Sequence, residues 1–206
     1  NYVMQTQPTL LKNKNISTCK SPMEMLAALV KTKHRDSYHV AVMPCTAKKM
    51  EAARPELDSM VDQVLTVREF AQFLQSKNMN LAELQDDVFD QLFDENSGAG
   101  RIFGASGGVM EAALRTAYPM LTGKELSQVE MKPLRGNAGI KTTELSVHGT
   151  ILKVAVVNGI GEIKTLLPKL NEYHFVEVMA CPGGCAGGGG RPLQGGTVVA
   201  RQNGMY

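Results

Sequence analysis

Three of the four cysteines stand at the end of apolar stretches whose composition favours β-strands. Cys45 closes the run 39–45, and Cys181 and Cys185 follow the run 175–180. Only Pro182 and two glycines separate Cys181 from Cys185, so little side-chain bulk keeps the two sulfurs from facing one centre. Thiolates that leave strand ends beside a glycine-rich loop are typical of a buried iron–sulfur site, which normally has four thiolate ligands. The sequence offers three of them at these loops.

Two other interpretations of these cysteines remain open on the residues alone. Structural zinc sites usually contain tight ligand pairs, and the four histidines are scattered along the chain without such pairing. A lone cysteine after a strand is often a small buried apolar residue. We therefore rank an iron–sulfur site first, zinc second and purely structural cysteines third. Cys19 lies in a polar stretch without a preceding strand, and we interpret it as a thiol outside the ligand set.

The composition excludes several classes of function. The 206 residues include 43% hydrophobic and 20% charged residues, as in ordinary globular domains. The net charge of +2, without a stripe of lysine and arginine, argues against nucleic acid as a partner. No apolar run approaches the roughly 18 residues that a membrane helix needs, so we expect no membrane insertion. Four cysteines are too few for a secreted disulfide scaffold.

The pattern of apolar residues predicts an α/β fold. Ser21 and Glu24 have the spacing of a capping box, and Thr66 with Glu69 repeats it. The apolar residues of the first of these helices form a stripe at Met25, Leu26, Leu29 and Val30. Further helices are expected at 46–53, 110–117 and 161–167, with a loop at 97–100. Strands are expected at 38–43, 64–65, 129–134, 142–147, 150–157 and 174–179.

Strands that alternate with helices in this way imply a partly parallel sheet. Ligand sites in such sheets lie beyond the carboxyl ends of the strands. Cys45, Cys181 and Cys185 all follow predicted strands. The sequence thus places its three candidate ligands where an α/β fold forms its sites.

The segments that carry the cysteines resemble motifs of the FeFe (iron-only) hydrogenases. Residues 43–51, Met-Pro-Cys-Thr-Ala-Lys-Lys-Met-Glu, resemble the second cluster motif of that family, and residues 177–192 resemble the third. Residues 97–115 are similar to the stretch between them, and the likeness covers essentially the whole chain. The resemblance implies two α/β lobes of mixed or partly parallel sheet flanked by helices, with the cluster between the lobes.

The resemblance also implies an activity and a cofactor. The reaction would be the reversible reduction of protons to H2, with electrons from ferredoxin or a similar carrier and with maturation proteins as further partners. The cofactor would be a 4Fe-4S cluster bridged by cysteine to a two-iron subsite with CO, cyanide and dithiolate ligands. By position, Cys45 and Cys181 would bind the 4Fe-4S cluster and Cys185 would form the bridge. A cytoplasmic or hydrogenosomal location is expected, and a periplasmic one stays open.

Further roles follow from the same resemblance. Lys48 would donate a hydrogen bond to a cyanide ligand, and Glu51 occupies the position of an acidic residue near that lysine. Ser17 aligns with a serine on the family's proton-transfer route. The residues that would line or contact the cluster are apolar or glycine: Met43, Pro44, Phe103, Gly104 and Met179.

One motif of the family is missing from the sequence. Thr-Ser-Cys-Cys-Pro supplies a cluster ligand and a proton-relay cysteine in the family, and it does not occur in residues 1–206. We therefore expect a partial catalytic domain, truncated at both ends, that is inactive in isolation. The alternatives are a hydrogenase-like iron–sulfur protein of the cluster-assembly type, without the two-iron subsite, and a zinc-stabilised binding module. Lys48, Glu51 and Phe103 argue against the former, because their implied roles serve the two-iron subsite.

Overall fold

The computed structural model describes residues 5–12, 16–88, 90, 92, 98–126, 132–136, 138–192 and 197–205. The chain divides into two compact units, of which one comprises Asn1–Ala41 with Ala47–Leu65 and the other Val42–Thr46 with Thr66–Tyr206. Helices and strands alternate along the chain, so the α/β class predicted from the sequence is confirmed. None of the helices within the described ranges is long and apolar enough to cross a membrane.

The larger unit is built on a three-stranded mixed sheet in the order β3-β4-β5. Strands β3 (Ile140–Val147) and β4 (Thr150–Asn158) form an antiparallel hairpin, and β5 (Phe175–Met179) pairs with β4 in parallel. His148 and Gly149 both have positive φ, at 49° and 80°, as a tight hairpin turn requires. The three strands and the parallel pairing agree with the sequence-based prediction.

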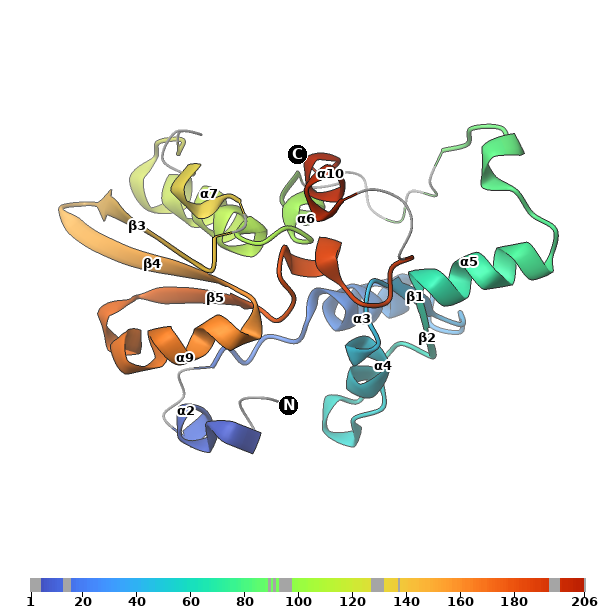
Figure 1. Ribbon diagram of the computed structural model, residues 1–206, viewed down its shortest axis with the longest axis horizontal. Coiled ribbons are helices and arrows are strands. Elements are labelled where there is room, and N and C mark those ends of the chain that lie inside the picture. The colour runs from blue at the N-terminus through green and yellow to red at the C-terminus, as the bar shows by residue number, and fades with distance from the viewer. Residues whose placement is uncertain are drawn as a thin grey trace. The chain divides into compact units, whose positions relative to one another are not determined.

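Helices cover both faces of this sheet. α7 (Gly108–Thr122) lies on one face, and α9 (Ile163–Leu166), which connects β4 to β5 between the 3-10 helices η4 (Ile160–Glu162) and η5 (Leu167–Glu172), lies on the other (Figure 1). Residues 154–157 are at most 1% exposed, because a central strand covered on both faces buries successive side chains. The core beneath α7 consists of Met110, Leu126, Leu134, Leu145, Val154 and Val156.

Among the remaining elements of this unit, α5 (Val67–Ser76) begins at a capping box that the sequence predicted. The box is complete, since the Glu69 amide donates to Thr66 Oγ1 and the Thr66 amide donates to Glu69 Oε2. The other elements are η2 (Leu81–Glu83), α6 (Gly98–Ile102), η3 (Lys132–Leu134), η6 (Gly184–Gly187) and α10 (Val198–Asn203).

Two sequence predictions in this unit are wrong. Residues 98–100 begin α6 instead of continuing a loop, because burial of Ile102 and packing of α6 on α7 outweigh the low helix propensity of glycine. Residues 132–134 form η3 instead of a strand, since Pro133 has no amide hydrogen to donate to a sheet. Ser97 and residues 129–131, which belonged to the same predictions, lie outside the described residues.

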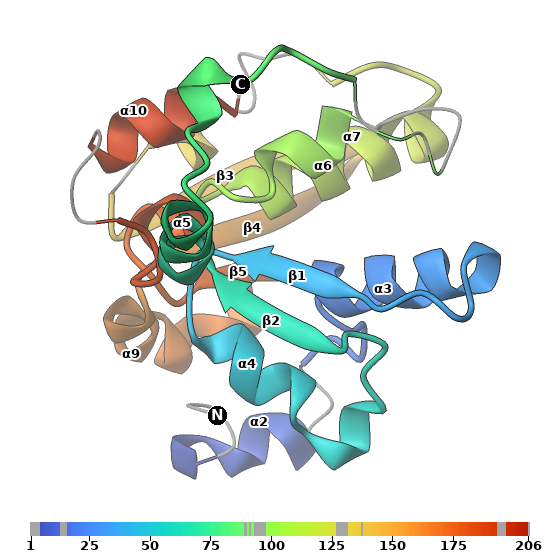
Figure 2. The same ribbon diagram turned by 90° about the vertical axis from the view of Figure 1, so that its right-hand side faces the viewer.

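The smaller unit contains α2 (Pro8–Lys12), α3 (Pro22–Lys33), α4 (Ala47–Ala52) and η1 (Pro55–Leu57). Strands β1 (Val40–Met43) and β2 (Gln63–Thr66) pair as a two-stranded sheet and carry the chain between the units (Figure 2). These strands and α4 match the predicted segments to within two residues at each end.

The start of α3 differs from the expectation. Ser21 has the extended backbone of an N-cap, yet its side chain makes no capping hydrogen bond. Glu24 is buried instead of capping, and its Oε1 accepts a 2.9 Å hydrogen bond from Ser59 Oγ. Because the helix turns this carboxylate inward, Met23 and Ala27 are buried with it. The predicted apolar stripe largely faces solvent, and three of its side chains are 46–56% exposed: Met25, Leu26 and Leu29.

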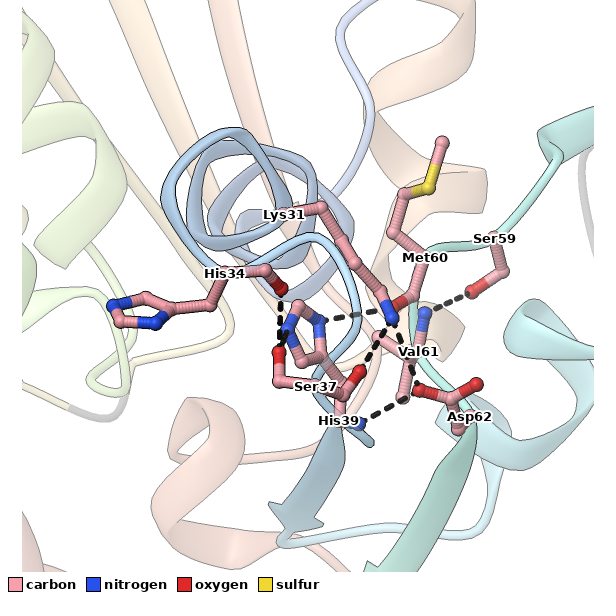
Figure 3. A network of polar contacts seen from close by, with 8 residues as sticks. All are labelled: Lys31, His34, Ser37, His39, Ser59, Met60, Val61 and Asp62. Carbon is pink, nitrogen blue, oxygen red and sulfur yellow. Dashed lines mark hydrogen bonds and ion pairs between the residues drawn. The ribbon is translucent and has the colours of Figure 1, made fainter.

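A polar network fixes the turn that precedes β1 (Figure 3). The His39 amide donates a 2.7 Å hydrogen bond to Asp62 Oδ2, and the Lys31 ammonium lies 3.5 Å from the same oxygen. The His39 ring lies between Ser37 Oγ at 2.8 Å and the Met60 carbonyl oxygen at 3.0 Å. The hydrogen bond from His39 is the main reason why the pKa of Asp62 is lowered, and Lys31 adds to the effect. The network joins α3 to the segment that enters β2.

Candidate iron–sulfur site

Two of the cysteine-bearing segments meet backbone to backbone. The Gly190 amide donates a 2.7 Å hydrogen bond to the carbonyl oxygen of Pro44, the residue before Cys45. A Cβ atom at Gly188 would collide with that oxygen, and one at Gly190 would lie 2.9 Å from the Pro44 carbonyl carbon. Only glycine allows the chain to approach this closely. The glycines after Cys185 therefore serve to bring this loop against the Cys45 segment.

The same loop also rests on residues 104–106. The Ala186 amide donates a 3.1 Å hydrogen bond to the carbonyl oxygen of Gly104. Gly184 has a φ of +73°, and a Cβ atom there would lie 2.7 Å from the Gly104 oxygen and 2.8 Å from the Ser106 nitrogen. Residues 44–45, 104–106 and 181–190 thus converge within the larger unit. Gly104, a predicted site residue, is part of this contact.

Polar side chains from the end of β4 and from α10 anchor the loop. Asn158, the last residue of β4, is 6% exposed, and its Oδ1 accepts a 2.6 Å hydrogen bond from the Gly183 amide. Gln202 on α10 donates from Nε2 to the Gly183 carbonyl oxygen at 3.0 Å. The loop therefore lies beyond the carboxyl ends of β4 and β5, where α/β sheets place their sites. Sequence reasoning missed both residues, although a polar residue closing the apolar run of β4 was a signal for Asn158.

The thiols differ in their exposure. Cys45 and Cys181 are half-buried, and Cys185 is exposed. Burial raises the pKa of Cys181, the charge of Cys45 raises it further, and a backbone hydrogen bond from Gly189 lowers it. Cys45 and Cys181 are therefore close enough for their charges to interact. A pair of thiolates in such surroundings is stabilised when a cation binds to it.

The donor set of the site is made of thiols. Across the described part of the chain, no three His, Cys, Asp or Glu side chains are grouped as ligands of a single metal ion. A 4Fe-4S cluster takes its thiolates at separate irons, and its ligands therefore stand farther apart than those of one ion. Soft thiolates from converging loops are the donor set that iron–sulfur clusters use. The residues present fit such a cluster as three of its ligands.

The other predicted site residues fall into two groups. Met43 and Met179 end β1 and β5, and Phe103 precedes Gly104; all three side chains are half-buried in the larger unit. In the smaller unit, Lys48 Nζ lies 2.5 Å from Glu51 Oε2 on α4, with side chains 24% and 21% exposed.

Ser17 and Cys19 are both exposed in the smaller unit. Ser17 Oγ accepts a 3.2 Å hydrogen bond from the Cys19 amide, and the Cys19 thiol is exposed. The interpretation of Cys19 as a thiol outside the ligand set stays a prediction.

Comparison with known proteins identifies the family. Residues 1–189 match the family model described as the iron-only hydrogenase large subunit, C-terminal domain. The chain belongs to this family. Membership in the iron-only hydrogenase family, inferred from the sequence motifs, is thereby confirmed.

Curated relatives include both hydrogenases and cluster-assembly factors. The chain is 43% identical to the periplasmic Fe hydrogenase large subunit of Nitratidesulfovibrio vulgaris, over 97% of this chain and 51% of that protein. It is 41% identical to iron hydrogenase 1 of Clostridium pasteurianum, over 90% of this chain and 35% of that protein. It is also 34% identical to the cytosolic Fe-S cluster assembly factor narfl of Xenopus tropicalis, over 85% of this chain and 41% of that protein. The chain spans about half or less of these relatives.

The fold is shared with solved hydrogenases. The apo FeFe-hydrogenase HydA1 of Chlamydomonas reinhardtii matches with a TM-score of 0.78 and 35% identity, covering 100% of this chain and 63% of that one. The mixed α/β architecture predicted from the sequence is thus that of an iron-only hydrogenase domain.

Proposed function

We propose that the natural protein containing this chain is an iron-only hydrogenase, which reduces protons to H2 reversibly with electrons from ferredoxin or a similar carrier. The observation that carries the proposal is the contact of the glycine loop 188–190 with Pro44. It joins the segments of Cys45, Cys181 and Cys185, whose spacing and surroundings fit three ligands of an iron–sulfur cluster. Two of the curated relatives named above are hydrogenases.

Each cysteine has a separate role in this proposal. Cys45 and Cys181 would be ligands of the 4Fe-4S cluster, and Cys185 would be the ligand shared with a two-iron subsite carrying CO, cyanide and dithiolate, which maturation proteins would install. When bound, this cofactor supplies one-electron transfer and the metal centre at which protons are reduced. Met43, Met179 and Phe103 exclude water around it with soft apolar side chains. Gly104 would let the backbone approach the ligands without side-chain crowding, and Pro44 would contribute to the apolar lining.

Lys48, Glu51 and Ser17 handle charge and protons. Lys48 would donate a hydrogen bond to a cyanide ligand, and Glu51 fixes the position of the ammonium through the 2.5 Å ion pair. A partly buried lysine is stabilised by an anionic partner, which the carboxylate already provides. Ser17, whose hydroxyl is exposed, holds a proton on the route between solvent and the site.

Iron binding by cysteine variants of the full natural chain tests the ligand set. After anaerobic reconstitution with iron and sulfide, the wild type should contain a 4Fe-4S cluster by metal analysis and electron paramagnetic resonance. Cys45→Ala and Cys181→Ala should lose most of the iron, because each removes a thiolate. Cys19→Ala is the matched control and should keep the cluster. A wild type that binds zinc in a ratio of one, or loss of iron in Cys19→Ala alone, contradicts the assignment.

Similarity to cluster-assembly factors supports a second candidate, an iron–sulfur protein with the 4Fe-4S cluster and no two-iron subsite. The two candidates predict different infrared spectra of the matured protein. A hydrogenase has CO and cyanide stretching bands and evolves H2, and Lys48→Gln shifts the cyanide bands. The cluster-assembly type has neither bands nor H2. Residues 1–206 by themselves provide three cysteines at the site, so we expect no H2 evolution from this segment alone.

A further inference from the structure

Two buried charged residues lie in one row across the sheet of the larger unit. In the strand register, Lys141 on β3 stands opposite Val156 on β4, and Val156 stands opposite Glu177 on β5. Paired residues in a sheet point to the same face, so both charged side chains share the face of Val156, beneath α7. Lys141 is 5% and Glu177 6% exposed. Buried charges are costly unless they are paired and hydrogen-bonded.

The Lys141 ammonium has an acceptor for each of its three hydrogens. Its Nζ donates to the Gly136 carbonyl oxygen at 2.7 Å, to the Ser106 carbonyl oxygen at 3.1 Å and to Ser106 Oγ at 3.2 Å. Ser106 is itself 1% exposed. Lys141 therefore holds both the backbone and the side chain of Ser106 from the β3 side.

The Glu177 carboxylate holds the next residues from the β5 side. Its Oε1 accepts a 2.7 Å hydrogen bond from the Gly107 amide, and its Oε2 accepts a 2.6 Å hydrogen bond from the Met110 amide at the start of α7. An anion at this end of the helix also interacts favourably with the helix dipole. The opposite charges of Lys141 and Glu177 stabilise each other.

The turn between these two residues is tightly constrained. Gly107 has a φ of +94°, and a Cβ atom there would collide with the Leu134 carbonyl oxygen. The turn leads back to Gly104, whose carbonyl oxygen accepts the Ala186 amide next to Cys185. Displacement of Ser106 or Gly107 would therefore be transmitted by the short backbone segment 104–107 to the cysteine loop.

We propose that Lys141 and Glu177 are positioning residues, which hold the backbone of residues 104–107 against the Cys181–Cys185 loop and so fix the surroundings of the cluster. The part that concerns the cluster rests on the proposed function. An apolar pair would fill the same core position without the cost of two buried charges. The charges are instead directed at backbone groups of the segment that contacts the loop.

Hydrogen exchange of the full natural chain without cluster tests the mechanical part. Lys141→Gln and Glu177→Gln should accelerate exchange of the peptide containing the Ala186 amide by about tenfold, because local opening of its partner segment becomes easier. Lys141→Arg keeps the charge and should restore slow exchange. Lys153→Gln and Glu144→Gln are the matched controls, since this exposed pair lies on the same sheet, 3.3 Å apart.

Ser106→Ala keeps the inference testable if the charge variants do not fold. It removes one acceptor of Lys141 and leaves both charges in place, and it should accelerate exchange at Ala186 by a smaller factor. Exchange that is unchanged in folded Ser106→Ala, Lys141→Gln and Glu177→Gln overturns the inference. An equal acceleration in Lys153→Gln overturns it as well.

The reconstituted protein tests the link to the cluster. Lys141→Gln and Glu177→Gln should keep the iron content of the wild type but alter the electron paramagnetic resonance spectrum of the reduced cluster, and Lys141→Arg should restore it. An unaltered spectrum in both variants overturns the link. A wild type without any iron–sulfur cluster contradicts the proposed function instead, and the exchange result at Ala186 distinguishes this outcome from failure of the positioning role.

Discussion

The Gly190 amide donates a 2.7 Å hydrogen bond to the carbonyl oxygen of Pro44, which ties the loop after Cys185 to the residue before Cys45. The two residues are far apart in sequence, and their contact depends on the absence of side chains between the backbones. Two motifs that are separate in the sequence thus form one structural feature. Iron–sulfur ligands from different segments need such a support, because only the folded chain brings distant thiolates together.

Glycine substitutions in this loop test the contact directly. Gly188→Ala and Gly190→Ala should each lower the free energy of unfolding by about 1–3 kcal/mol, since the new methyl group would meet Pro44 backbone atoms. Gly189→Ala is the control, because nothing lies within 4 Å of a Cβ atom at that position. Urea denaturation measures all three. A Gly189→Ala effect as large as the others would show that the close approach is not the cause.

Glu111 lies away from the cysteines, and its substitution should lower the stability of the fold. This residue is 1% exposed, and its carboxylate lies 2.6 Å from Arg135 and 2.8 Å from Arg115. Glu111→Gln should cost about 1–3 kcal/mol of unfolding free energy, because it removes the buried charge that accepts hydrogen bonds from two partly exposed guanidinium groups. Glu144→Gln, at an exposed ion pair, should cost less than about 1 kcal/mol. Equal costs in urea denaturation would contradict this reading of Glu111.

Titration of the buried Lys141 side chain should make the stability of the fold depend on pH. Burial lowers the pKa of Lys141 from 10.5 to about 8, and the charge of Glu177 counteracts part of this effect. Between these values the unfolded chain binds more protons than the folded chain, so the contribution of Lys141 to stability rises with pH. The difference in unfolding free energy between wild type and Lys141→Gln should therefore grow by up to about 3 kcal/mol from pH 8 to pH 10.5. A constant difference over this range would refute the assignment.

Local signals explain which elements the sequence predicts well. The hairpin of β3 and β4 follows from two strand-forming runs joined by the His148-Gly149 turn, and α5 follows from the Thr66–Glu69 capping box. Ser21 and Glu24 have the same spacing, but Glu24 bonds to Ser59, a residue distant in sequence. A capping motif specifies a possible hydrogen bond, and tertiary contacts decide whether it forms.

The same distinction applies to the candidate site. The cysteines and their glycines stand out as motifs, since their chemistry depends on residue type and spacing. Asn158, Lys141 and Glu177 act through partners that only the folded sheet brings near them. For Lys141, as for Asn158, position on a strand was the available signal, because Lys141 shares a strand face with the buried Leu145. Without the register, nothing in the sequence relates that lysine to Ser106.

The network around His39 predicts a loss of stability in acid. The hydrogen bond from the His39 amide lowers the pKa of Asp62, so this carboxylate contributes stability above its unfolded pKa, and the contribution disappears as the pH falls through the lower folded value. In Asp62→Asn, the His39 amide hydrogen should therefore exchange faster than in wild type at pH 7. Near pH 2 the exchange rates of the two proteins should converge. Asp58→Asn, at an exposed position of left-handed backbone that asparagine tolerates, is the control. A His39 amide equally protected in wild type and Asp62→Asn at pH 7 would show that the carboxylate does not hold this turn.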